Sequence, residues 1–511
     1  MRHLAQLACL GLAAACAAPR AEAPASSNHV VVGVTRLTTS FDPRTAVLRP
    51  ALELSFLLYE RLVLVDSSGA LRPYLARRWR ADSAAGTLTF VLRPGARFHD
   101  GSPVRARDVV RSFTPDPSDT AGRAQYAPLL DLLVGGRDFN AGRTRQVEGV
   151  SAPDDSTVVL RFAPGHAPDA TLLAGAPYVI LGPGASAVRE NGSGPWRLVA
   201  GTAGDSMLVL ARVQPVSGYP DTLYYVTIGG QDLAPRLLAG TVDCVPFLPS
   251  AVRRALVTRT DVVVRDDGPL NLQLIDFSPR RAAWADVRAR RAIAHLVDRP
   301  AFLRAMSLRG TLTSGFLSPV GVNRDSIADV PIAADPSAAR ALLDSAGIAA
   351  GDTVRLFVNA GSATDTLSGV VGALGAALRA IDRVPVYVTG GDFTAAIADG
   401  QVDIALYLLG MQFTEEPLAA FLAGGQIGDV THVRQRVGDL SALERMLRAD
   451  TSSTHRRDVL RRIDARFRSA QPLVPLWFVP GSSASRAGVT GCAMEAAGTT
   501  HYLTLRRSSA P

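Results

Sequence analysis

The sequence contains no lysine, and all 54 of its basic side chains are arginine. With 46 acidic residues the formal net charge is +8, a balance that often accompanies binding to nucleic acid or to membrane surfaces. The arginines are scattered, however, and their densest groups recur at the spacing of a helix surface. Such groups are typical of solvated helix faces, and we expect no nucleic-acid binding.

Cysteine is scarce, with four residues in the chain, two of them within the first sixteen positions. Only Cys244 and Cys492 remain beyond that segment, which excludes a disulfide framework and allows at most one bridge. Two separate buried thiols are the favoured interpretation, and one disulfide in an oxidising compartment is the alternative. No cysteines or histidines have the spacing of a metal site, so we expect no metal and no cofactor.

Motifs of hydrolytic enzymes are missing as well. The stretch Gly192-Ser193-Gly194 lacks the spacing of a nucleophile elbow, and no His-Glu-x-x-His zinc helix occurs. The adjacent acids Asp154-Asp155 and Glu415-Glu416 are better explained by turns than by a catalytic carboxylate pair. His99 beside Asp100 is likewise better explained by a hydrogen bond that stabilises a turn. The sequence therefore argues against an enzyme.

The N-terminus has the pattern of an export signal. A basic residue precedes the apolar run Leu4 to Ala15, which is too short to span a bilayer and ends in small residues. Ala13 to Cys16 resembles a bacterial lipoprotein box, whose cysteine is acylated and becomes the new N-terminus. The box usually has leucine three residues before the cysteine, whereas Leu12 lies four before it, so plain cleavage near Ala18 is the alternative.

The clearest sign of the fold class is a regular alternation of strand and helix patterns. Strand patterns at 354–358, 384–388 and 403–408 alternate with helix patterns at 367–380 and 393–398. Such βαβαβ units form parallel sheets through right-handed crossovers. The N-terminal half instead has hairpin patterns around turns, as at Asp66 to Gly69 and at Asp154-Asp155. The chain is predicted to be an α/β protein.

Several segments, in a fixed order, resemble a single family. The longest is Thr89 to Pro103, followed by Asp108 to Phe113. The others are Phe41-Asp42-Pro43, Leu57 to Leu62, Pro73 to Trp79, Gly192 to Trp196, Leu238 to Asp243, Asp286 to Arg299, Asp335 to Gly347, Gly400 to Asp403 and Pro472 to Leu476. In residues and order they are similar to the dipeptide- and oligopeptide-binding proteins of bacterial ABC importers, solute-binding protein family 5.

The resemblance implies a two-lobed periplasmic-binding-protein-like fold with a discontinuous lobe I, a small extra subdomain and a hinge that closes on ligand. We place the two crossings between the lobes near Asp276-Phe277-Ser278 and Val479-Pro480-Gly481, where strand patterns end in breakers. The expected units are a lipoprotein signal peptide (1–16), a flexible tether (17–28), lobe I (29–48, 186–277 and 481–511), its small subdomain (49–185) and lobe II (278–480).

The resemblance also implies a function. We expect the substrate-binding component of an ABC-type importer, which captures a peptide-like solute in an interlobe cleft and delivers it to a membrane permease. Its partners would be the permease and ATPase subunits and, through lipid on Cys16, a bacterial membrane on its periplasmic or cell-surface side. The protein would be a monomer. A sensor or other non-transport binder of the same fold, and a binder of oligosaccharide or another non-peptide solute, are the alternatives.

The ligand site is expected where strands of open sheets end. The candidate ligand-binding residues are Thr38, Thr39, Ser40, Gly194, Trp196, Asn359, Met411, Gln412, Phe413, Thr414, Glu415 and Trp477. Peptide binders of this kind usually carry a tryptophan after the last strand and then an aspartate that pairs with the ligand's amino terminus. Here Met411 replaces the tryptophan, and Glu415 is the candidate for the missing carboxylate, with a solvent-facing Glu415 as the alternative.

Overall fold

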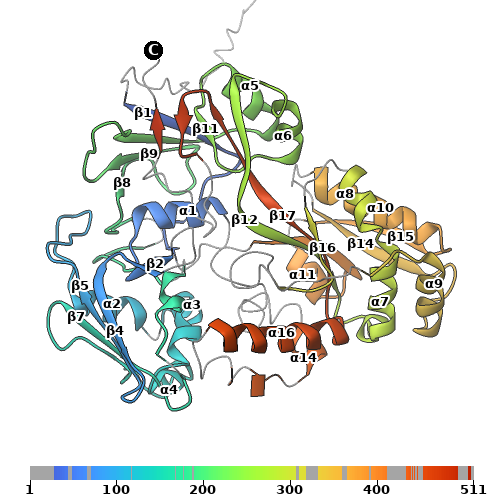
Figure 1. Ribbon diagram of the computed structural model, residues 1–511, viewed down its shortest axis with the longest axis horizontal. Helices are drawn as coiled ribbons and strands as arrows, with labels where there is room; N and C mark the ends of the chain where they lie inside the picture. Colours follow the sequence, from blue (N-terminus) through green and yellow to red (C-terminus); the bar gives the residue numbers. More distant parts are fainter. Residues whose placement is uncertain are drawn as a thin grey trace, which may run out of the picture.

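The chain forms two α/β lobes joined by two long strands (Figure 1). The computed structural model describes residues 28–38, 40–43, 49–65, 71–116, 118–166, 168–175, 178–186, 189–305, 310–317, 332–359, 365–390, 393–410, 433–438, 440, 442–443, 446, 453–492 and 505–507. One sheet runs through both lobes in the order β15-β14-β16-β12-β17-β11-β1-β10-β9-β8. The predicted α/β class and two-lobed fold are therefore confirmed.

Lobe II contains the predicted βαβαβ unit. Its parallel strands are β14 (Thr353–Asn359), β15 (Val384–Gly390) and β16 (Ile404–Gly410), and its helices are α10 (Asp365–Arg379) and α11 (Phe393–Ala398). Further helices pack around it: α7 (Val287–Leu296), α8 (Arg299–Ala305), α9 (Pro336–Ser345), α14 (Val433–Val437) and α16 (Ser453–Ala470). Helix α9 starts as predicted, because the Asp335 carboxylate accepts the Ala338 N–H at 2.9 Å.

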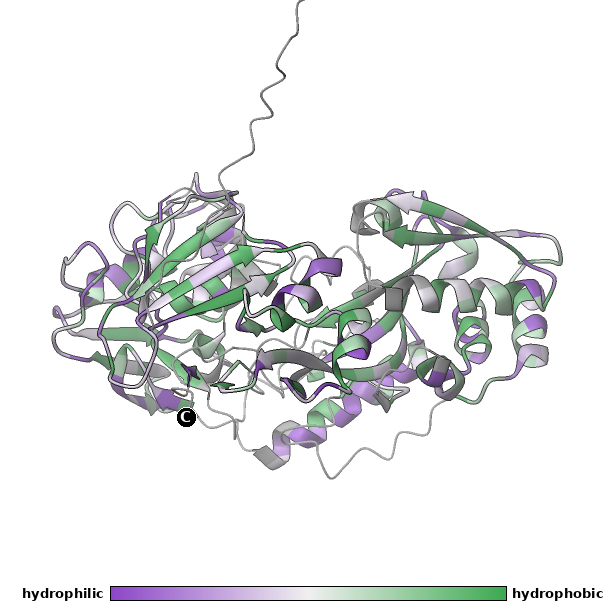
Figure 2. Cartoon of the chain, turned by 90° about the horizontal axis from the view of Figure 1, so that it is seen from above, coloured by the Kyte–Doolittle hydropathy of each residue, from purple (hydrophilic) through white to green (hydrophobic). Residues whose placement is uncertain are grey.

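Lobe I is built on the end of the sheet opposite to β15. Its strands are β1 (His29–Val34), β8 (Trp196–Ala200), β9 (Met207–Arg212), β10 (Thr222–Thr227) and β11 (Cys244–Val245). Its helices are α1 (Arg49–Leu58), α5 (Leu233–Leu238) and α6 (Ser250–Leu256). In Figure 2 the hydrophobic residues are concentrated in the strands of both lobes, which places the cores against the sheet.

The small subdomain has a sheet of its own, in the order β4-β5-β7-β6. These strands are β4 (Ala76–Asp82), β5 (Thr87–Leu92), β6 (Val150–Ser151) and β7 (Thr157–Arg161), and they pack with α2 (Ala106–Phe113), α3 (Thr120–Leu130) and α4 (Gly136–Asn140). In β5 the side chains of Leu88, Phe90 and Leu92 are buried, while Thr89 and Val91 between them are partly exposed. The predicted hairpin before this sheet is also present, as β2 (Val63–Val65) paired with β3 (Leu71–Pro73).

The two lobes share strands β12 (Val262–Phe277) and β17 (Val474–Arg486) (Figure 1). Their register shifts at two places, and the larger interruption lies between Asp266 opposite Ser482 and Leu270 opposite Pro480, so residues 267–269 stand opposite Gly481 alone. The second shift lies between Gln273 and Leu274. Proline has no backbone N–H to donate to a sheet, which explains the interruption at Pro269 and Pro480.

The interruption in β12 lies before the crossing proposed from the sequence. In β12 the change of partners lies at residues 267–269, earlier than the crossing expected near Asp276-Phe277-Ser278, because residues 271–277 already pair with β16 of lobe II. The crossing expected at Val479-Pro480-Gly481 lies where the interruption in β17 is found. On the lobe I side Asp266 accepts hydrogen bonds from Arg253 Nε at 2.6 Å and from Ser482 Oγ at 2.8 Å.

Asp276 instead lies deep in lobe II. Its side chain is fully buried, and burial raises its pKa to about 7, against the opposing effect of Arg436 of α14, whose Nη1 lies 3.6 Å from the carboxylate. Arg436 also donates to the carbonyl of Pro472 at 2.9 Å. The contact between Asp276 and Arg436 therefore anchors the carboxyl end of β12 to α14.

Cys244 and Cys492 form a disulfide, which overturns the favoured interpretation of two separate thiols. Cys244 lies in β11 and is paired with Ser485 of β17. Cys492 follows β18 (Val489–Thr490), which comes shortly after β17 in the chain. The pairing of β11 with β17 therefore brings Cys492 close to Cys244. The bridge joins positions 248 residues apart, a separation that gives the sequence no local signal of the pairing.

The disulfide should add substantially to stability. Replacing both cysteines by serine, as Cys244→Ser with Cys492→Ser, is expected to lower the free energy of unfolding by ~2–5 kcal/mol, because the reduced unfolded chain is less constrained. Urea denaturation followed by circular dichroism measures this change. Reductant should lower the midpoint of the wild type and leave that of the double variant unchanged; equal midpoints for the two oxidised proteins would contradict the expectation.

Candidate functional site

The directions of the strands determine which loops face the space between the lobes. Strand β12 runs from lobe I into lobe II, and both β11 and β12 are antiparallel to β17. Strands β1 and β10 are parallel to β11, so all three end on the side of lobe I that faces lobe II. Strand β16 is antiparallel to β12, and β14 and β15 are parallel to β16, so these strands end on the side of lobe II that faces lobe I.

The two sets of parallel strands therefore direct their carboxyl ends toward each other across the crossing strands. Such ends are where open α/β sheets bind ligands. The loop that contains Thr38 and Ser40 follows β1, Asn359 is the last residue of β14, and Gly410, which ends β16, stands opposite Asn271 near the interruption in β12. The described candidates Thr38, Ser40 and Asn359 thus follow or end strands that run toward the inter-lobe side. Thr39 and Met411 to Glu415 lie outside the described residues.

The loop after β1 is held in shape by its own polar groups. The Ser40 N–H donates to Thr38 Oγ1 at 3.1 Å, and the Asp42 N–H donates to Ser40 Oγ at 3.1 Å. Tyr59 Oη donates to the Phe41 carbonyl at 2.9 Å and ties the loop to the end of α1. These bonds give the loop a defined conformation next to α1.

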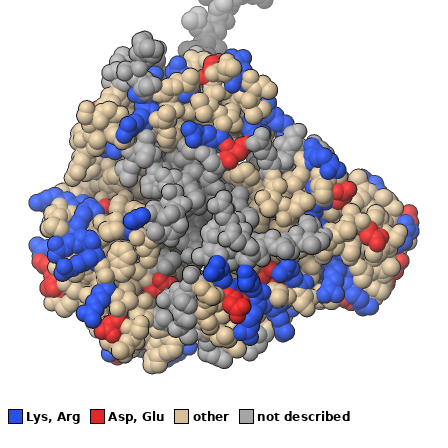
Figure 3. Space-filling model, viewed as in Figure 1, with Lys and Arg blue, Asp and Glu red and all other residues tan. Residues whose placement is uncertain are grey.

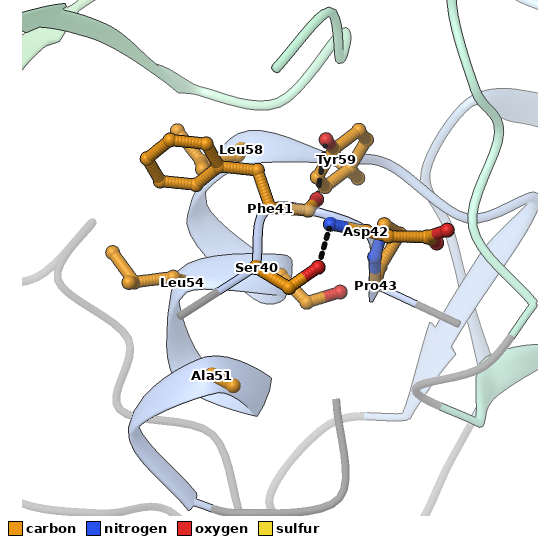
Figure 4. A pocket seen from close by; sticks show the side chains of 9 residues that line it. Ser40, Phe41, Asp42, Pro43, Ala51, Leu54, Leu58 and Tyr59 are labelled. Atoms are coloured by element: carbon orange, nitrogen blue, oxygen red, sulfur yellow. Dashed lines mark hydrogen bonds between the residues drawn. The ribbon is translucent and has the colours of Figure 1, made fainter. Parts of the chain in front are cut away.

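A small pocket lies between this loop and α1 (Figure 4). It encloses about 200 Å³ of space, part of it open to solvent. Its lining is formed by Ser40, Phe41, Asp42, Pro43, Ala51, Leu54, Ser55, Leu58 and Tyr59. Among these, Ser55 was not predicted from the sequence; its only signal is a serine on the helix face that otherwise carries Ala51, Leu54 and Leu58.

The end of α1 packs closely against the turn that contains Gly194. The Gly194 N–H donates to the Leu58 carbonyl at 3.0 Å, and an added Cβ at Gly192 would lie 1.8 Å from that carbonyl oxygen. Only glycine permits this approach. Gly194 therefore helps to fix the position of α1, and its predicted ligand contact stays a prediction.

The same turn is fixed by His99. Its Nε2 lies 3.0 Å from the Gly194 carbonyl and its Nδ1 contacts the Glu190 carboxylate, which also accepts the Gly192 N–H at 2.7 Å. Asp100 bonds separately to Ser102 and Asn191. The histidine does stabilise a turn, as expected, but its acidic partner is Glu190 and its contacts join the small subdomain to lobe I.

Two charged residues follow α1. Glu60 is buried, which raises its pKa, while its ion pair with Arg93 at 2.5 Å opposes that rise. Arg61 is buried too, and burial lowers its pKa to about 10. The Arg61 guanidinium lies 3.9 Å from the centre of the Phe56 ring, a cation–π contact that partly replaces lost hydration.

The remaining predicted residues lie in the cores. Trp196 is fully buried at the amino end of β8, the end away from lobe II, with Arg212 stacked 4.5 Å from its ring centre. Trp477 is fully buried in β17 opposite Gln273 and within the core of lobe II. Both side chains pack within the cores, and their predicted ligand contacts stay predictions.

Arginines lie on both lobes and on the small subdomain, with acidic side chains among them, on the face shown in Figure 3. Within the described parts of the chain, no helix combines the length and the apolar character that a membrane crossing needs.

Comparison with known proteins identifies the family. Residues 70–423 match the bacterial extracellular solute-binding proteins, family 5 middle, which is more than half of the 511 residues. The chain belongs to this family. The family expected from the sequence motifs is thereby confirmed, and it is a family of binding proteins rather than enzymes.

Curated relatives align only in part. The periplasmic oligopeptide-binding protein OppA of Haemophilus influenzae is 33% identical over 136 residues, which are 26% of this chain and 25% of that protein. The murein peptide-binding protein MppA of Escherichia coli is 24% identical over 324 residues, 58% of this chain and 59% of that protein. Heme-binding protein A of Haemophilus influenzae is 27% identical over 359 residues, 64% and 63% of the two chains. The chain thus spans at most about three fifths of the length of these relatives.

Solved structures match over nearly the whole chain. Haemophilus influenzae OppA in complex with RPPGFSPFR has a TM-score of 0.79 at 18% identity and covers 94% of this chain and 99% of its own. The binding protein AgaA in complex with agropinic acid has a TM-score of 0.76 at 20% identity, with 94% and 99% coverage. At these identities the likeness shows the fold alone.

The close contact between α1 and its neighbouring turn can be tested with two glycines. Gly192→Ala is expected to lower the free energy of unfolding by about 1–3 kcal/mol or more, because its Cβ would overlap the Leu58 carbonyl. Gly372→Ala in α10 is the matched control: its Cβ meets nothing within 4 Å and should raise stability by ~0.5–1 kcal/mol. Urea denaturation of both variants measures the difference, and a neutral Gly192→Ala would refute the close packing.

Proposed function

We propose that the chain is the substrate-binding component of an ABC-type importer, which captures a peptide-like solute between its lobes and delivers it to a membrane permease. The observation that carries the proposal is the opposed arrangement of strand ends, with β1, β10 and β11 of lobe I facing β14, β15 and β16 of lobe II. A solute held there touches both lobes and favours their closure.

Peptide is the favoured solute class because several relatives are named for peptides, among them the oligopeptide- and murein peptide-binding proteins. Met411 stands where peptide binders usually carry tryptophan, and other relatives are named for heme and deoxycholate. These two observations favour a non-peptide solute as the second candidate. In the peptide case Glu415 is proposed to pair with the ligand's amino terminus.

The solute and the closure can be tested together. Protein purified from its native host without refolding is denatured, and the released small molecules are identified by mass spectrometry, with protein refolded from urea as the solute-free control. Peptides are expected in the first sample only. Small-angle scattering should then show a smaller radius of gyration when the identified solute is added to refolded protein; no recovered solute, or an unchanged radius at saturation, would count against the proposal.

We also propose that the protein is exported and lipid-anchored at Cys16. The support is the short apolar run before that cysteine, together with relatives named as periplasmic proteins. The units proposed from the sequence follow from this: a signal peptide over 1–16 and a tether over 17–28.

Membrane association should therefore depend on one thiol. Cys16→Ser, expressed in a bacterial host with lipoprotein processing, is expected to move the protein from the membrane fraction to the soluble fraction, whereas Cys9→Ser should leave it in the membrane. Fractionation and immunoblotting measure this. A Cys16→Ser protein that still sediments with membranes would show that the anchor lies elsewhere.

A further inference from the structure

The imidazole of His99 lies between two hydrogen-bond acceptors. Its Nε2 lies 3.0 Å from the Gly194 carbonyl oxygen, and its Nδ1 contacts Oε1 of Glu190. A carbonyl oxygen cannot donate a hydrogen bond, and the same Glu190 oxygen already accepts the Gly192 N–H at 2.7 Å. A neutral imidazole has a single N–H donor, so it satisfies one of these two contacts and not the other. The geometry therefore fits the doubly protonated ring, which donates from both nitrogens.

The contact between the two side chains is shielded from solvent. The exposed fractions of the His99 and Glu190 side chains are 6% and 5%. A pair in such a place is weakly screened by salt, and the loss of one charge leaves the other buried without its partner. The protonation of this histidine therefore affects the fold more than the protonation of an exposed one.

The other charged groups around His99 have partners of their own. Burial raises the pKa of Glu60, and its ion pair with Arg93 of β5 and, more weakly, the charge of His99 oppose that rise. Asp100 has a lowered pKa because it accepts hydrogen bonds from its own turn, and Arg189 acts on it at longer range. Within the described part of the chain, the acid in direct contact with the ring is the glutamate of the turn before β8.

The ring joins the small subdomain to lobe I. His99 follows β5 of the small subdomain, whereas Gly194 leads into β8 of lobe I. The Gly194 N–H donates to the Leu58 carbonyl at the end of α1 at 3.0 Å. Tyr59 comes next in the chain, and its Oη donates to the Phe41 carbonyl in the loop after β1 at 2.9 Å. Direct contacts therefore connect His99 to a loop on the inter-lobe side.

We propose that His99 and Glu190 form a pH-sensitive latch between the small subdomain and lobe I. With both ring nitrogens protonated, the latch holds the turn at 190–194 against the end of α1. When the pH rises and the ring loses one proton, one of the two acceptors loses its donor, and the turn, α1 and the loop after β1 are held less firmly. These two positioning residues make the arrangement of the candidate site depend on pH, whichever solute is captured.

The protonation of the ring can be observed directly in the wild type. Nuclear magnetic resonance of isotope-labelled histidine rings gives the state of each nitrogen, and His99→Gln identifies the signals that belong to His99. Both nitrogens should carry a proton at about pH 6, and one should lose it as the pH is raised to about 9, a range that spans ordinary histidine titration. A Nδ1 without a proton throughout this range would overturn the proposal.

Urea denaturation over the same range tests the effect on the fold. Glu190→Gln keeps an oxygen for the Gly192 N–H and gains an amide N–H that can donate to a neutral His99, so it removes the need for the second proton. Since the folded wild type retains that proton more firmly than the unfolded chain, its stability is highest at low pH and falls as the pH rises. Relative to Glu190→Gln, its unfolding constant should rise about ten-fold from about pH 6 to about pH 9.

A second histidine provides the matched control. The described contact of the His295 ring is one acceptor, the Ala333 carbonyl, which lies 3.1 Å from Nδ1, so one N–H satisfies it. His295→Gln should therefore keep the pH profile of the wild type. Hydrogen exchange in segments 53–60 and 190–194, corrected for the intrinsic rate, should increase with pH in the wild type and not in Glu190→Gln. Parallel pH profiles of these two proteins would refute the latch, and if Glu190→Gln does not fold, the ring signals of the wild type decide.

Discussion

The pairing of β12 with β17 is the constraint on which the rest of the structure depends. These two strands are hydrogen-bonded to each other in both lobes, and every other strand of the long sheet takes its direction from them. Because β11 and β16 lie on opposite sides of this pair and run in opposite directions, the parallel strands of each lobe end toward the other lobe. The position of the candidate site follows from sheet topology before any side chain is considered.

The same pair of strands explains how the lobes could move. Gly268-Pro269 in β12 and Pro480-Gly481 in β17 interrupt the ladder at a single level, where the prolines provide no N–H and the glycines permit wider backbone angles. On the lobe I side of this interruption, Arg253 and Ser482 hold Asp266 in place. An interruption in the pairing of β12 with β17, next to a segment held by hydrogen bonds to Asp266, is a suitable arrangement for a hinge.

Local sequence patterns predicted the helices and strands well, but they could not predict contacts between residues that are far apart in the sequence. The βαβαβ unit, the Asp335 cap and the hairpin before β3 depend on neighbouring residues, and all are present. The disulfide joins Cys244 and Cys492, which lie 248 residues apart in sequence, and Trp196 is covered by residues of another strand, such as Arg212 of β9. The pattern of residues within a single strand predicts neither the disulfide nor the burial of Trp196.

Helix α1 shows how a close backbone contact can fix one element in place. At its end the Leu58 carbonyl meets Gly192 and Gly194, whose lack of side chains allows the backbones to touch. The turn that contains these glycines is itself held by His99, whose ring contacts the Gly194 carbonyl and the Glu190 carboxylate. The position of α1 therefore depends on the small subdomain as well as on its own lobe.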